Sequence, residues 1–498
     1  MEPVLRALAR SIAGTVAVDA VSRARAGRDG SHLVGDPRAV VRPRSSEDVV
    51  ATVRWARARR IPLVPRGAGT SLDGESVPVD GAVVVDLSGW ARIREICPEE
   101  GWARVDSGVV NLDLQRALAR RGLFFPPNPG SWDSCTIGGN VGTNASGPRT
   151  FRYGSTRSWV RSLDLVLGTG ATARWGSRAP KRSVGPDLVS LFVGSEGTLG
   201  IATQVVVRTA PVPAVRRGLV VELGVRASLG DVVGRLATVA GTGLSAIEYL
   251  DRPCAAELDA TGSLGLGGEA NLLLLEVEAE SAREWEGRRA RIVGALWGAH
   301  GSHRITDFPD ADRLWSLRGR ASVALDRRFR ARIREDVSVP LGAVDRLHRE
   351  VERIAAAERV PVYVFGHVGD GNLHPNFVVA PASAAATRIR AALWGAALRL
   401  GGTISAEHGI GAIKSGVLER EIGGPGIEVL RALKTACDPD GILNPGKLYP
   451  ARAGRRSSPS PSGSEGVAGR RGAPTGARRG SARTRALGAT LRRRAARP

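Results

Sequence analysis

The chain has 498 residues, of which 42% are hydrophobic, and carries a formal net charge of +22. This length can bury a full core in two or three domains, and no apolar run approaches the roughly 18 residues that a membrane-spanning helix needs. The four cysteines are scattered and form no Cys-x-x-Cys pair. Iron–sulfur, zinc-knuckle and disulfide scaffolds are therefore not expected, and a reducing, cytoplasmic location, free or peripheral at the inner membrane face, fits best.

Alternating helix and strand patterns follow one another along the first two hundred residues. The N-terminus, residues 1–21, reads as an amphipathic helix and not as a signal peptide, because charged residues interrupt its apolar positions. A second helix is predicted over 45–60 and a third over 111–121. Strands are predicted over residues 61–64, 82–87, 101–106, 163–167, 172–175 and 205–208.

The pattern changes from about residue 215. Strands are predicted over 219–223 and 272–277, and helices over 229–240, 282–300, 310–329, from about 343, and over 427–437. A strand before the segment DVSVP and a hairpin over 360–379 complete the region. Helices mixed with antiparallel strands predict an α+β fold.

The C-terminal tail accounts for about half of the net charge. Residues 451–498 hold thirteen arginines and one acid, are rich in Gly, Ser, Pro and Ala, and contain no aromatic residue. We expect this tail to be disordered. A basic protein that binds nucleic acid or membranes is thus an alternative function, although a tail without aromatic residues argues against base stacking, and no specific nucleic acid is expected.

The segment FGHVGDGNLHPNF, residues 365–377, is the most informative motif of the chain. Asp370-Gly371 between two apolar runs predicts a two-residue hairpin turn. That turn would place His367 directly opposite His374, with Asn376 on the same face. Two cross-strand histidines can also be a plain polar pair, but the chain has only seven histidines.

A metal site is the more specific interpretation of this histidine pair. A carboxylate is the expected third ligand for a divalent ion, and Glu407 in the segment SAEHGIG is the best candidate. We therefore predict that His367, His374 and Glu407 bind a divalent metal, with Zn²⁺ or Mn²⁺ expected.

Four glycine-rich segments in the first half of the chain predict a phosphate-containing ligand. They begin at residues 65, 128, 152 and 192 and combine Gly with Thr, Ser or Asn. Glycines let backbone N–H groups approach phosphate oxygens. None is a Rossmann or Walker A motif. One such loop could be ordinary turn chemistry, but four favour a long phosphorylated ligand.

Taken in order, the motifs PRGAGTSL, NPGS, TIGGNVGTNASGP, RYGSTR, GSEGTLGI, GHVGDGNLHPN, SAEHGIG and ILNPGK make the chain resemble a known family. It is similar to the FAD-linked oxidases of the vanillyl-alcohol-oxidase and p-cresol-methylhydroxylase fold, in the branch of D-lactate dehydrogenases, glycolate oxidase catalytic subunits and D-2-hydroxyglutarate dehydrogenases. The resemblance covers about residues 29–450. It implies a two-part FAD-binding domain (1–212), a substrate domain with an antiparallel sheet and the metal site (213–420), and a C-terminal segment that returns to the FAD domain (421–450), followed by the tail (451–498).

The resemblance also implies the residues that contact FAD. They are Arg66, Gly67, Ala68, Gly69, Thr70 and Ser71 at the pyrophosphate, and Gly130, Ser131, Thr136, Gly139, Asn140, Asn144, Ser146, Gly147, Ile201 and Asn444 elsewhere along the cofactor. Members with covalent flavin carry a histidine in the first of these loops, and this chain has none there. FAD is therefore expected to be noncovalent.

For catalysis, the resemblance implies His408 as the base that removes the hydroxyl proton, and Arg318 as the cation for the substrate carboxylate. Ser322 follows Arg318 by one helical turn, Asn376 would touch the substrate, and Arg334 stands where some relatives carry a second carboxylate-binding cation. A solvated basic helix is the usual explanation for an arginine-rich stretch such as 313–330, and only the Trp-x-Leu-Arg motif sets Arg318 apart. Lys434 and Lys447 are interpreted as surface lysines.

The function implied is FAD-dependent oxidation of a small anionic D-2-hydroxy acid, similar to D-lactate, to the 2-oxo acid. Glycolate and D-2-hydroxyglutarate are the alternatives within the family, and an alkyl-ether lipid synthase is a different activity on the same fold. The electron acceptor is expected to be a quinone or a carrier protein, and a homodimer is the expected assembly.

Overall fold

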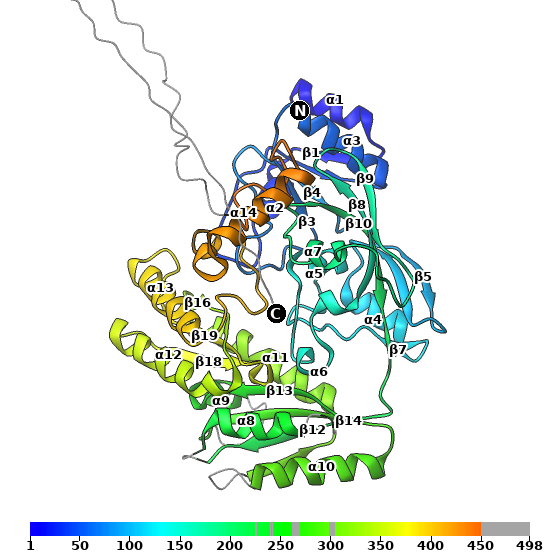
Figure 1. Ribbon diagram of the computed structural model, residues 1–498. Coiled ribbons are helices and arrows are strands. Elements are labelled where there is room, and N and C mark those ends of the chain that lie inside the picture. The colour runs from blue at the N-terminus through cyan, green and yellow to red at the C-terminus, as the bar shows by residue number, and fades with distance from the viewer. Residues whose placement is uncertain (225–226, 240, 242, 261–268, 298–303, 450–498) are drawn as a thin grey trace, which may run out of the picture. The chain divides into compact units, whose positions relative to one another are not determined.

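Two sheets and a short strand pair occupy the first part of the molecule (Figure 1). The computed structural model describes residues 1–224, 227–239, 241, 243–260, 269–297 and 304–449. The four-stranded sheet has the order β1 (Thr15–Ala17), β2 (Ala39–Arg42), β4 (Val83–Asp86), β3 (Leu63–Arg66). The antiparallel five-stranded sheet has the order β5 (Ile93–Cys97), β6 (Trp102–Asp106), β10 (Gly200–Arg208), β8 (Val160–Leu167), β9 (Thr172–Gly176). The strand pair is β7 (Leu123–Phe124) with β11 (Ala210–Pro211).

An antiparallel eight-stranded sheet follows along the chain (Figure 1). Its order is β15 (Arg304–Phe308), β12 (Val215–Glu222), β14 (Leu272–Ala279), β13 (Leu244–Leu250), β18 (Val362–Gly366), β19 (Asn372–Phe377), β16 (Ile333–Arg334), with β17 (Val337–Ser338) also paired to β19. Helices and antiparallel strands are thus mixed, as the sequence predicts for an α+β fold.

The helices connect and cover these sheets. They are α1 (Pro3–Ser11), α2 (Ala20–Ala26), α3 (Ser46–Arg57), α4 (Asn111–Ala119), α5 (Ile137–Thr143), α6 (Thr150–Tyr153), α7 (Leu188–Phe192), α8 (Leu229–Thr238), α9 (Arg252–Asp259), α10 (Ala282–Trp297), α11 (Ala311–Arg328), α12 (Val344–Glu358), α13 (Ala384–Arg399) and α14 (Glu419–Cys437). Most predicted helices lie where the sequence places them, and α3 starts at the expected cap, since the Ser45 side chain accepts a hydrogen bond from Asp48 N. The elements that were not predicted include the helices α2, α9 and α13 and the strands β2, β5, β13 and β15.

Both faces of the large sheet are covered, which explains its apolar strands. In β14, Leu273 and Leu275 pack into the core shared with α8, α10, α12 and α13. Leu272 and Leu274 point the other way, toward α9 and α11. Because successive side chains alternate between faces, a strand buried on both sides reads as a continuous apolar run. The face toward α11 also carries the residues of the site described below.

The predicted N-terminal helix over 1–21 is wrong in its extent. Helix α1 ends at Ser11, and the chain then forms β1, which pairs antiparallel with β2. Gly14 lies at the break, where a Cβ atom would come within 2.2 Å of the Arg42 carbonyl oxygen. Pairing with a sheet therefore outweighs the helical pattern of the sequence.

The last described segment returns to the first sheet. Leu63 N donates to the Ile442 carbonyl (2.8 Å), and Asn444 N donates to the Leu63 carbonyl (2.7 Å). Helix α14, which precedes this segment, is interrupted at Gly423, where φ is +72°. The predictions for residues 298–300 and for the tail 451–498 lie outside the described residues. Within the described ranges, none of the helices combines the length and the apolar character that crossing a bilayer would require.

Candidate active site

The hairpin that carries the two histidines has a different register from the predicted one. His374 pairs with Phe365, not with His367, because the loop holds four residues and not two. Val368 to Asp370 form a 3-10 turn, and only Gly371 has positive φ (+70°), whereas a two-residue type I′ turn needs it at both positions. Val368 is fully buried in the core, which accounts for the longer loop.

The two imidazoles nevertheless meet. The register differs from the prediction by two residues, and an even shift leaves each side chain on its original face of the sheet. His367 and His374 lie with their ring centroids 5.0 Å apart, at an interplanar angle of 84°. The predicted convergence is therefore found, although the pairing that predicted it is wrong.

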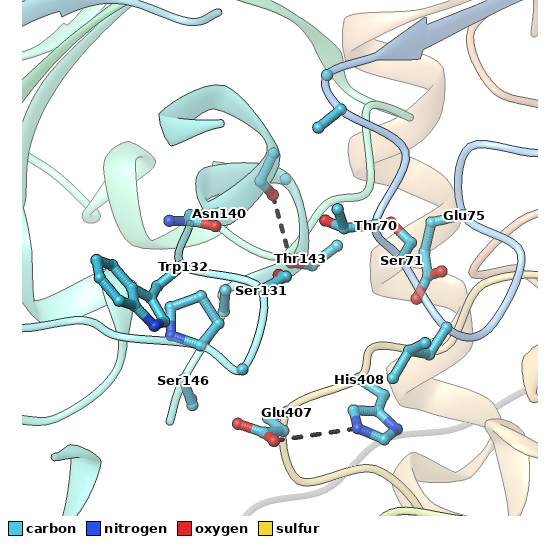
Figure 2. A pocket seen from close by; sticks show the side chains of 18 of the residues that line it. Thr70, Ser71, Glu75, Ser131, Trp132, Asn140, Thr143, Ser146, Glu407 and His408 are labelled. Carbon is cyan, nitrogen blue, oxygen red and sulfur yellow. Dashed lines mark hydrogen bonds and ion pairs between the residues drawn. The ribbon is translucent and has the colours of Figure 1, made fainter. Parts of the chain in front are cut away.

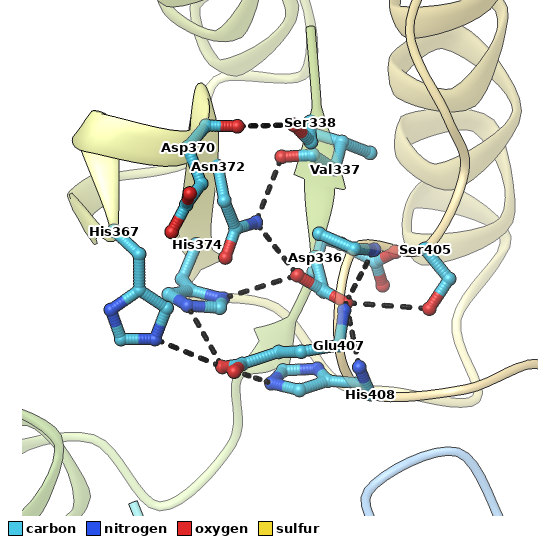
Figure 3. A network of polar contacts seen from close by, with 12 residues as sticks. Asp336, Val337, Ser338, His367, Asp370, Asn372, His374, Ser405, Glu407 and His408 are labelled. Atoms are coloured by element: carbon cyan, nitrogen blue, oxygen red, sulfur yellow. Dashed lines mark hydrogen bonds and ion pairs between the residues drawn. The ribbon is translucent and has the colours of Figure 1, made fainter. Parts of the chain in front are cut away.

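A buried aspartate holds the loop that supplies Glu407 and His408. One carboxylate oxygen of Asp336, Oδ2, accepts hydrogen bonds from three successive backbone amides, those of Ala406 (2.9 Å), Glu407 (2.8 Å) and His408 (2.8 Å). Its other oxygen accepts from the Asn372 amide (2.8 Å) on β19. Asp336 thus fixes the loop against the histidine hairpin (Figure 3).

Glu407 lies among three histidines (Figure 3). Its Oε1 is 3.1 Å from His367 Nε2, 3.3 Å from His374 Nε2 and 4.0 Å from His408 Nε2. The His408 ring stacks on His374 at a centroid distance of 5.2 Å. The second nitrogen of His367, Nδ1, lies 2.5 Å from Oε1 of Glu248, a fully buried residue of β13.

Two of these histidines have pKa values shifted in opposite directions. Burial disfavours charge on His367, yet Glu248 and Glu407 raise its pKa well above the usual range. Burial likewise acts against ionised Glu407, but His367 and His374 bring its pKa well below the usual range. Burial lowers the pKa of His408 to about 4, against the partial opposition of Asp336. His408 is consequently neutral near pH 7 and able to accept a proton.

The donor set fits a divalent ion. Two ligands at roughly 2.1 Å from a tetrahedral ion lie roughly 3.4 Å apart. The distances from Glu407 Oε1 to the two histidine Nε2 atoms have this size, and the three ligand atoms lie within 4.8 Å of one another. Glu407 Oε2 is buried without a hydrogen-bond partner among the described residues, whereas His374 Nδ1 faces Asp336 Oδ1 at 3.5 Å and leaves Nε2 toward Glu407. Asp336, His374 and His408 form a second group of this kind, but Asp336 already accepts hydrogen bonds through both oxygens.

Arg318 differs from the other arginines of α11 in being buried. It is 8% exposed, while Arg313, Arg320, Arg327 and Arg328 of this helix, and Arg330 beyond its end, are exposed. Its Nε donates to Glu248 Oε2 (2.7 Å), and its guanidinium lies 4.5 Å from the centroid of the Phe365 ring. The solvated-helix explanation therefore holds for its neighbours and not for Arg318 itself.

The other predicted catalytic residues surround an arginine that sequence reasoning missed. Buried Arg332 donates to the Asn376 side-chain oxygen and, through Nη2, to Ser322 Oγ (2.9 Å). Asp326 accepts from Arg332 (2.8 Å) and from Arg334 (2.7 Å). The side chain of Arg334 stays about one-third exposed.

One cavity of about 490 Å³ joins these residues to the glycine-rich loops (Figure 2). From the predicted catalytic and metal residues, its lining includes Arg318, Ser322, Arg334, His367, His374, Asn376, Glu407 and His408. From the predicted FAD residues, it includes Arg66, Gly67, Ala68, Gly69, Thr70, Ser71, Gly130, Ser131, Thr136, Gly139, Asn140 and Ser146. Segments far apart in the sequence thus line one space.

The loops at the other end of the cavity fit an extended cofactor such as FAD. A Cβ atom on Gly67 would lie 2.2 Å from Thr136 Oγ1, and Gly69 has φ of +72°, so neither position accommodates a side chain. The side-chain nitrogen of Asn140 is buried without a hydrogen-bond partner among the described residues, although Asn140 lines the cavity. The unpaired Asn140 nitrogen can donate to a ligand, and the two glycines let that ligand approach the backbone closely, so this end of the cavity suits a polar ligand.

Four predicted FAD residues lie outside the cavity lining. Ile201, a residue of β10, is fully buried in the core that this strand shares with α3 and the four-stranded sheet. Asn144 adopts a left-handed conformation (φ +54°), with its side-chain oxygen accepting from Arg157 N (2.9 Å). Gly147 packs against the Asn128 carbonyl. Asn444 donates to the carbonyls of Glu75 (2.8 Å) and Glu196 (2.6 Å), two residues that do line the cavity.

Several buried charged residues of this region were not predicted from the sequence. Besides Arg332, they are Glu248, Asp336 and Lys414, whose Nζ lies 2.9 Å from Asp73 Oδ2. The signal available for Glu248 was one acid inside the apolar run LSAIEYL. The interpretation of Lys434 and Lys447 as surface lysines is wrong, because Lys447 is 4% exposed and Lys434 donates to the Thr198 carbonyl (2.8 Å).

Known families match both halves of the chain. A model of the FAD binding domain matches residues 37–176, and one of the C-terminal domain of FAD linked oxidases matches residues 212–448. Glycolate oxidase subunit GlcD of Bacillus subtilis is 34% identical over 437 residues, which are 84% of this chain and 90% of that protein. D-2-hydroxyglutarate dehydrogenase of Stutzerimonas stutzeri is 32% identical (88% and 97%), and D-lactate dehydrogenase of Archaeoglobus fulgidus is 34% identical (82% and 90%).

Solved structures of other enzymes share the fold of this chain. p-Cresol methylhydroxylase with bound substrate has a TM-score of 0.76 at 16% identity, covering 90% of this chain and 96% of that chain. 4-Ethylphenol oxidase from Gulosibacter chungangensis has a TM-score of 0.75 at 19% identity, covering 90% and 97%. The predicted p-cresol-methylhydroxylase type of fold is confirmed. With matching family models, near full-length relatives and a cavity suited to the cofactor, the chain belongs to the FAD-linked oxidases.

Proposed function

We propose that this protein oxidises a D-2-hydroxy acid, similar to D-lactate, to the corresponding 2-oxo acid. The observation that carries the proposal is the cluster His367, His374, Glu407 and His408 at one end of the cavity whose other end suits FAD. A proton acceptor, a candidate metal site and a buried arginine at the same cavity match the needs of an anionic alcohol substrate.

Arg318 is proposed to bind the substrate carboxylate. Glu248 occupies its Nε, and no partner is described for its terminal nitrogens, which leaves them for a cavity ligand. A guanidinium binds a carboxylate well through two parallel N–H groups. Ser322, Asn376 and Arg334 would complete the polar surroundings of the substrate.

His408 is proposed to accept the hydroxyl proton. Its pKa of about 4 leaves it neutral at pH 7, and its Nδ1 has no hydrogen-bond partner among the described residues. His367, His374 and Glu407 would hold the ion. What these side chains cannot supply themselves, polarisation of the hydroxyl and acceptance of the hydride, would come from bound Zn²⁺ or Mn²⁺ and from FAD.

The flavin is proposed to be noncovalent. In the described part of the chain no cysteine or tyrosine lines the cavity, and the histidines that do are those of the cluster. Acid precipitation should therefore release the yellow colour into solution. Flavin that stays with the pellet would contradict this.

The substrate is best tested with a panel of D- and L-2-hydroxy acids and an artificial dye acceptor. The names of the relatives motivate the inclusion of glycolate and D-2-hydroxyglutarate. We expect the D-enantiomers to reduce the dye and D-lactate to be among the better substrates. Reduction by L-enantiomers alone, or by no 2-hydroxy acid, would overturn the proposal.

The electron acceptor is proposed to be a quinone or a carrier protein, with oxygen a poor acceptor. Peroxide formation should then be much slower than dye reduction with the same substrate. Equal rates would contradict this part of the proposal, and sedimentation analysis would test the expected homodimer.

A further inference from the structure

A single buried carboxylate, that of Glu248, connects the histidine cluster to Arg318. Its Oε1 lies 2.5 Å from His367 Nδ1, and its Oε2 accepts from Arg318 Nε at 2.7 Å. Glu248 is fully buried in the middle of β13, on the face of the large sheet that α11 covers. Both oxygens are thus used, each by a different functional side chain.

This arrangement determines which atoms the two partners present to the cavity. A proton shared with Glu248 at Nδ1 leaves His367 Nε2 as the nitrogen that faces Glu407, 3.1 Å away. The bond at Nε, together with the Phe365 ring 4.5 Å from the guanidinium, orients Arg318 so that its terminal nitrogens stay available. A carboxylate behind a metal-binding histidine commonly fixes its tautomer and ring orientation in this way.

We propose that Glu248 is a positioning residue that aligns the metal-binding nitrogen of His367 and the carboxylate-binding end of Arg318 together. The inference rests on the proposed function of those two residues. It also extends it, since binding of the ion and binding of the substrate carboxylate then depend on one side chain that touches neither. A carboxylate is required because both partners donate. An amide offers one acceptor and turns its NH₂ group toward the second donor.

The test is Glu248→Gln in the FAD-loaded protein. We expect affinity for Zn²⁺ and Mn²⁺, measured by competition with a chelator, to fall roughly 10- to 100-fold. Affinity for pyruvate, followed by the change in flavin absorbance, should fall at least about fivefold, since the charge-assisted bond to Arg318 is lost. Bound flavin should be unchanged. If the Gln variant does not fold, Glu248→Asp is the second variant, because its shorter side chain keeps the charge but cannot reach both partners.

A double-mutant cycle separates positioning from a general structural effect. In a His367→Ala background, Glu248→Gln should weaken metal binding by less than about twofold further, because the group through which it acts is gone. Equal losses in the two backgrounds would overturn the inference.

A matched control is Glu335→Gln. Glu335 is also buried and also accepts from a guanidinium and a ring N–H, those of Arg390 (2.8 Å) and Trp394 (3.0 Å), but it does not line the cavity. It should leave metal and pyruvate affinity unchanged. Wild-type protein that binds neither ion would overturn the metal site and this inference together. If the wild-type protein binds an ion and the Glu248→Gln variant binds it with the same affinity, the inference alone is overturned.

Discussion

The two ends of the cavity differ in the groups that line them: mainly backbone at the cofactor end and ionisable side chains at the histidine end. The cofactor end consists of glycine-rich loops in which bare backbone and a few hydroxyl and amide groups line the space, with Gly67 and Gly69 at positions that exclude a side chain. The histidine end consists of ionisable side chains whose orientation depends on buried carboxylates, above all Asp336 and Glu248. Side-chain truncation should therefore disable the histidine end alone, while the cofactor end should be damaged by adding atoms.

The largest expected effect is that of His408→Ala. Removal of the proton acceptor should lower kcat by roughly 10²–10⁴-fold. Bound metal and flavin should stay at wild-type levels, because His408 is not in the proposed ligand set. Steady-state kinetics with D-lactate, together with metal analysis and the flavin spectrum, checks this. Unchanged turnover would remove His408 from its proposed role.

His374→Ala tests whether the two ends are independent. Loss of one of three ligands should weaken metal binding by at least about tenfold and slow turnover, while flavin content stays constant. Metal analysis and flavin absorbance of the purified variant are the measurements. Full activity of a wild-type protein stripped of metal would contradict the metal site, and flavin loss in the variant would contradict the separation of the two ends.

Gly67→Ala should damage the cofactor end only. The added Cβ would lie 2.2 Å from Thr136 Oγ1, and overpacking of this kind costs the folded protein about 1–3 kcal/mol. Because both residues line the cofactor end, relief of the clash should displace the loop from its flavin-binding position and lower flavin affinity by up to roughly 150-fold. Flavin titration of the apoprotein measures the loss. Gly89→Ala is the control, because no atom lies within 4 Å of the position its Cβ would take. Equal flavin affinity of both variants would show that the cofactor end tolerates a side chain at Gly67.

The last expected effect is on stability and concerns Glu196, which joins the two ends. This cavity-lining residue accepts hydrogen bonds from Ile410 N (2.7 Å) and Gly411 N (2.9 Å), next to the His408 loop. Burial raises its pKa to about 7 from the usual 4.5. Between these two values the folded state binds more protons than the unfolded state, so this group's contribution to stability falls as the pH rises.

Glu196→Gln cannot ionise and should lack this loss. Its free energy of unfolding relative to the wild type should rise by up to about 3 kcal/mol between pH 4.5 and 7.5. Thermal unfolding of both proteins across this range is the measurement. Exposed Glu428→Gln controls for the removal of one charge. If the difference in free energy of unfolding between the variant and the wild type stays constant or falls as the pH rises, the pKa of the buried Glu196 carboxyl is not raised.

The sequence by itself determined the family, the cofactor and the chemical character of both ends of the cavity. Its loop motifs are local: glycines where backbone must approach a ligand, and a turn sequence between two apolar runs. The sequence predicts that His367 and His374 lie close together because side chains along a strand alternate between faces with a period of two. For the same reason the two rings still meet although the observed register differs from the predicted one by two residues.

Only the tertiary structure decided the loop between those histidines and the charges behind them. Val368 turns into the core and lengthens the loop, which depends on packing partners far along the chain. Glu248 and Asp336 lie 119 and 71 residues from the groups they hold, His367 and Glu407. A buried charge is stable only beside its partners, and pairings over such separations are set by sheet topology, so single-residue patterns do not reveal them.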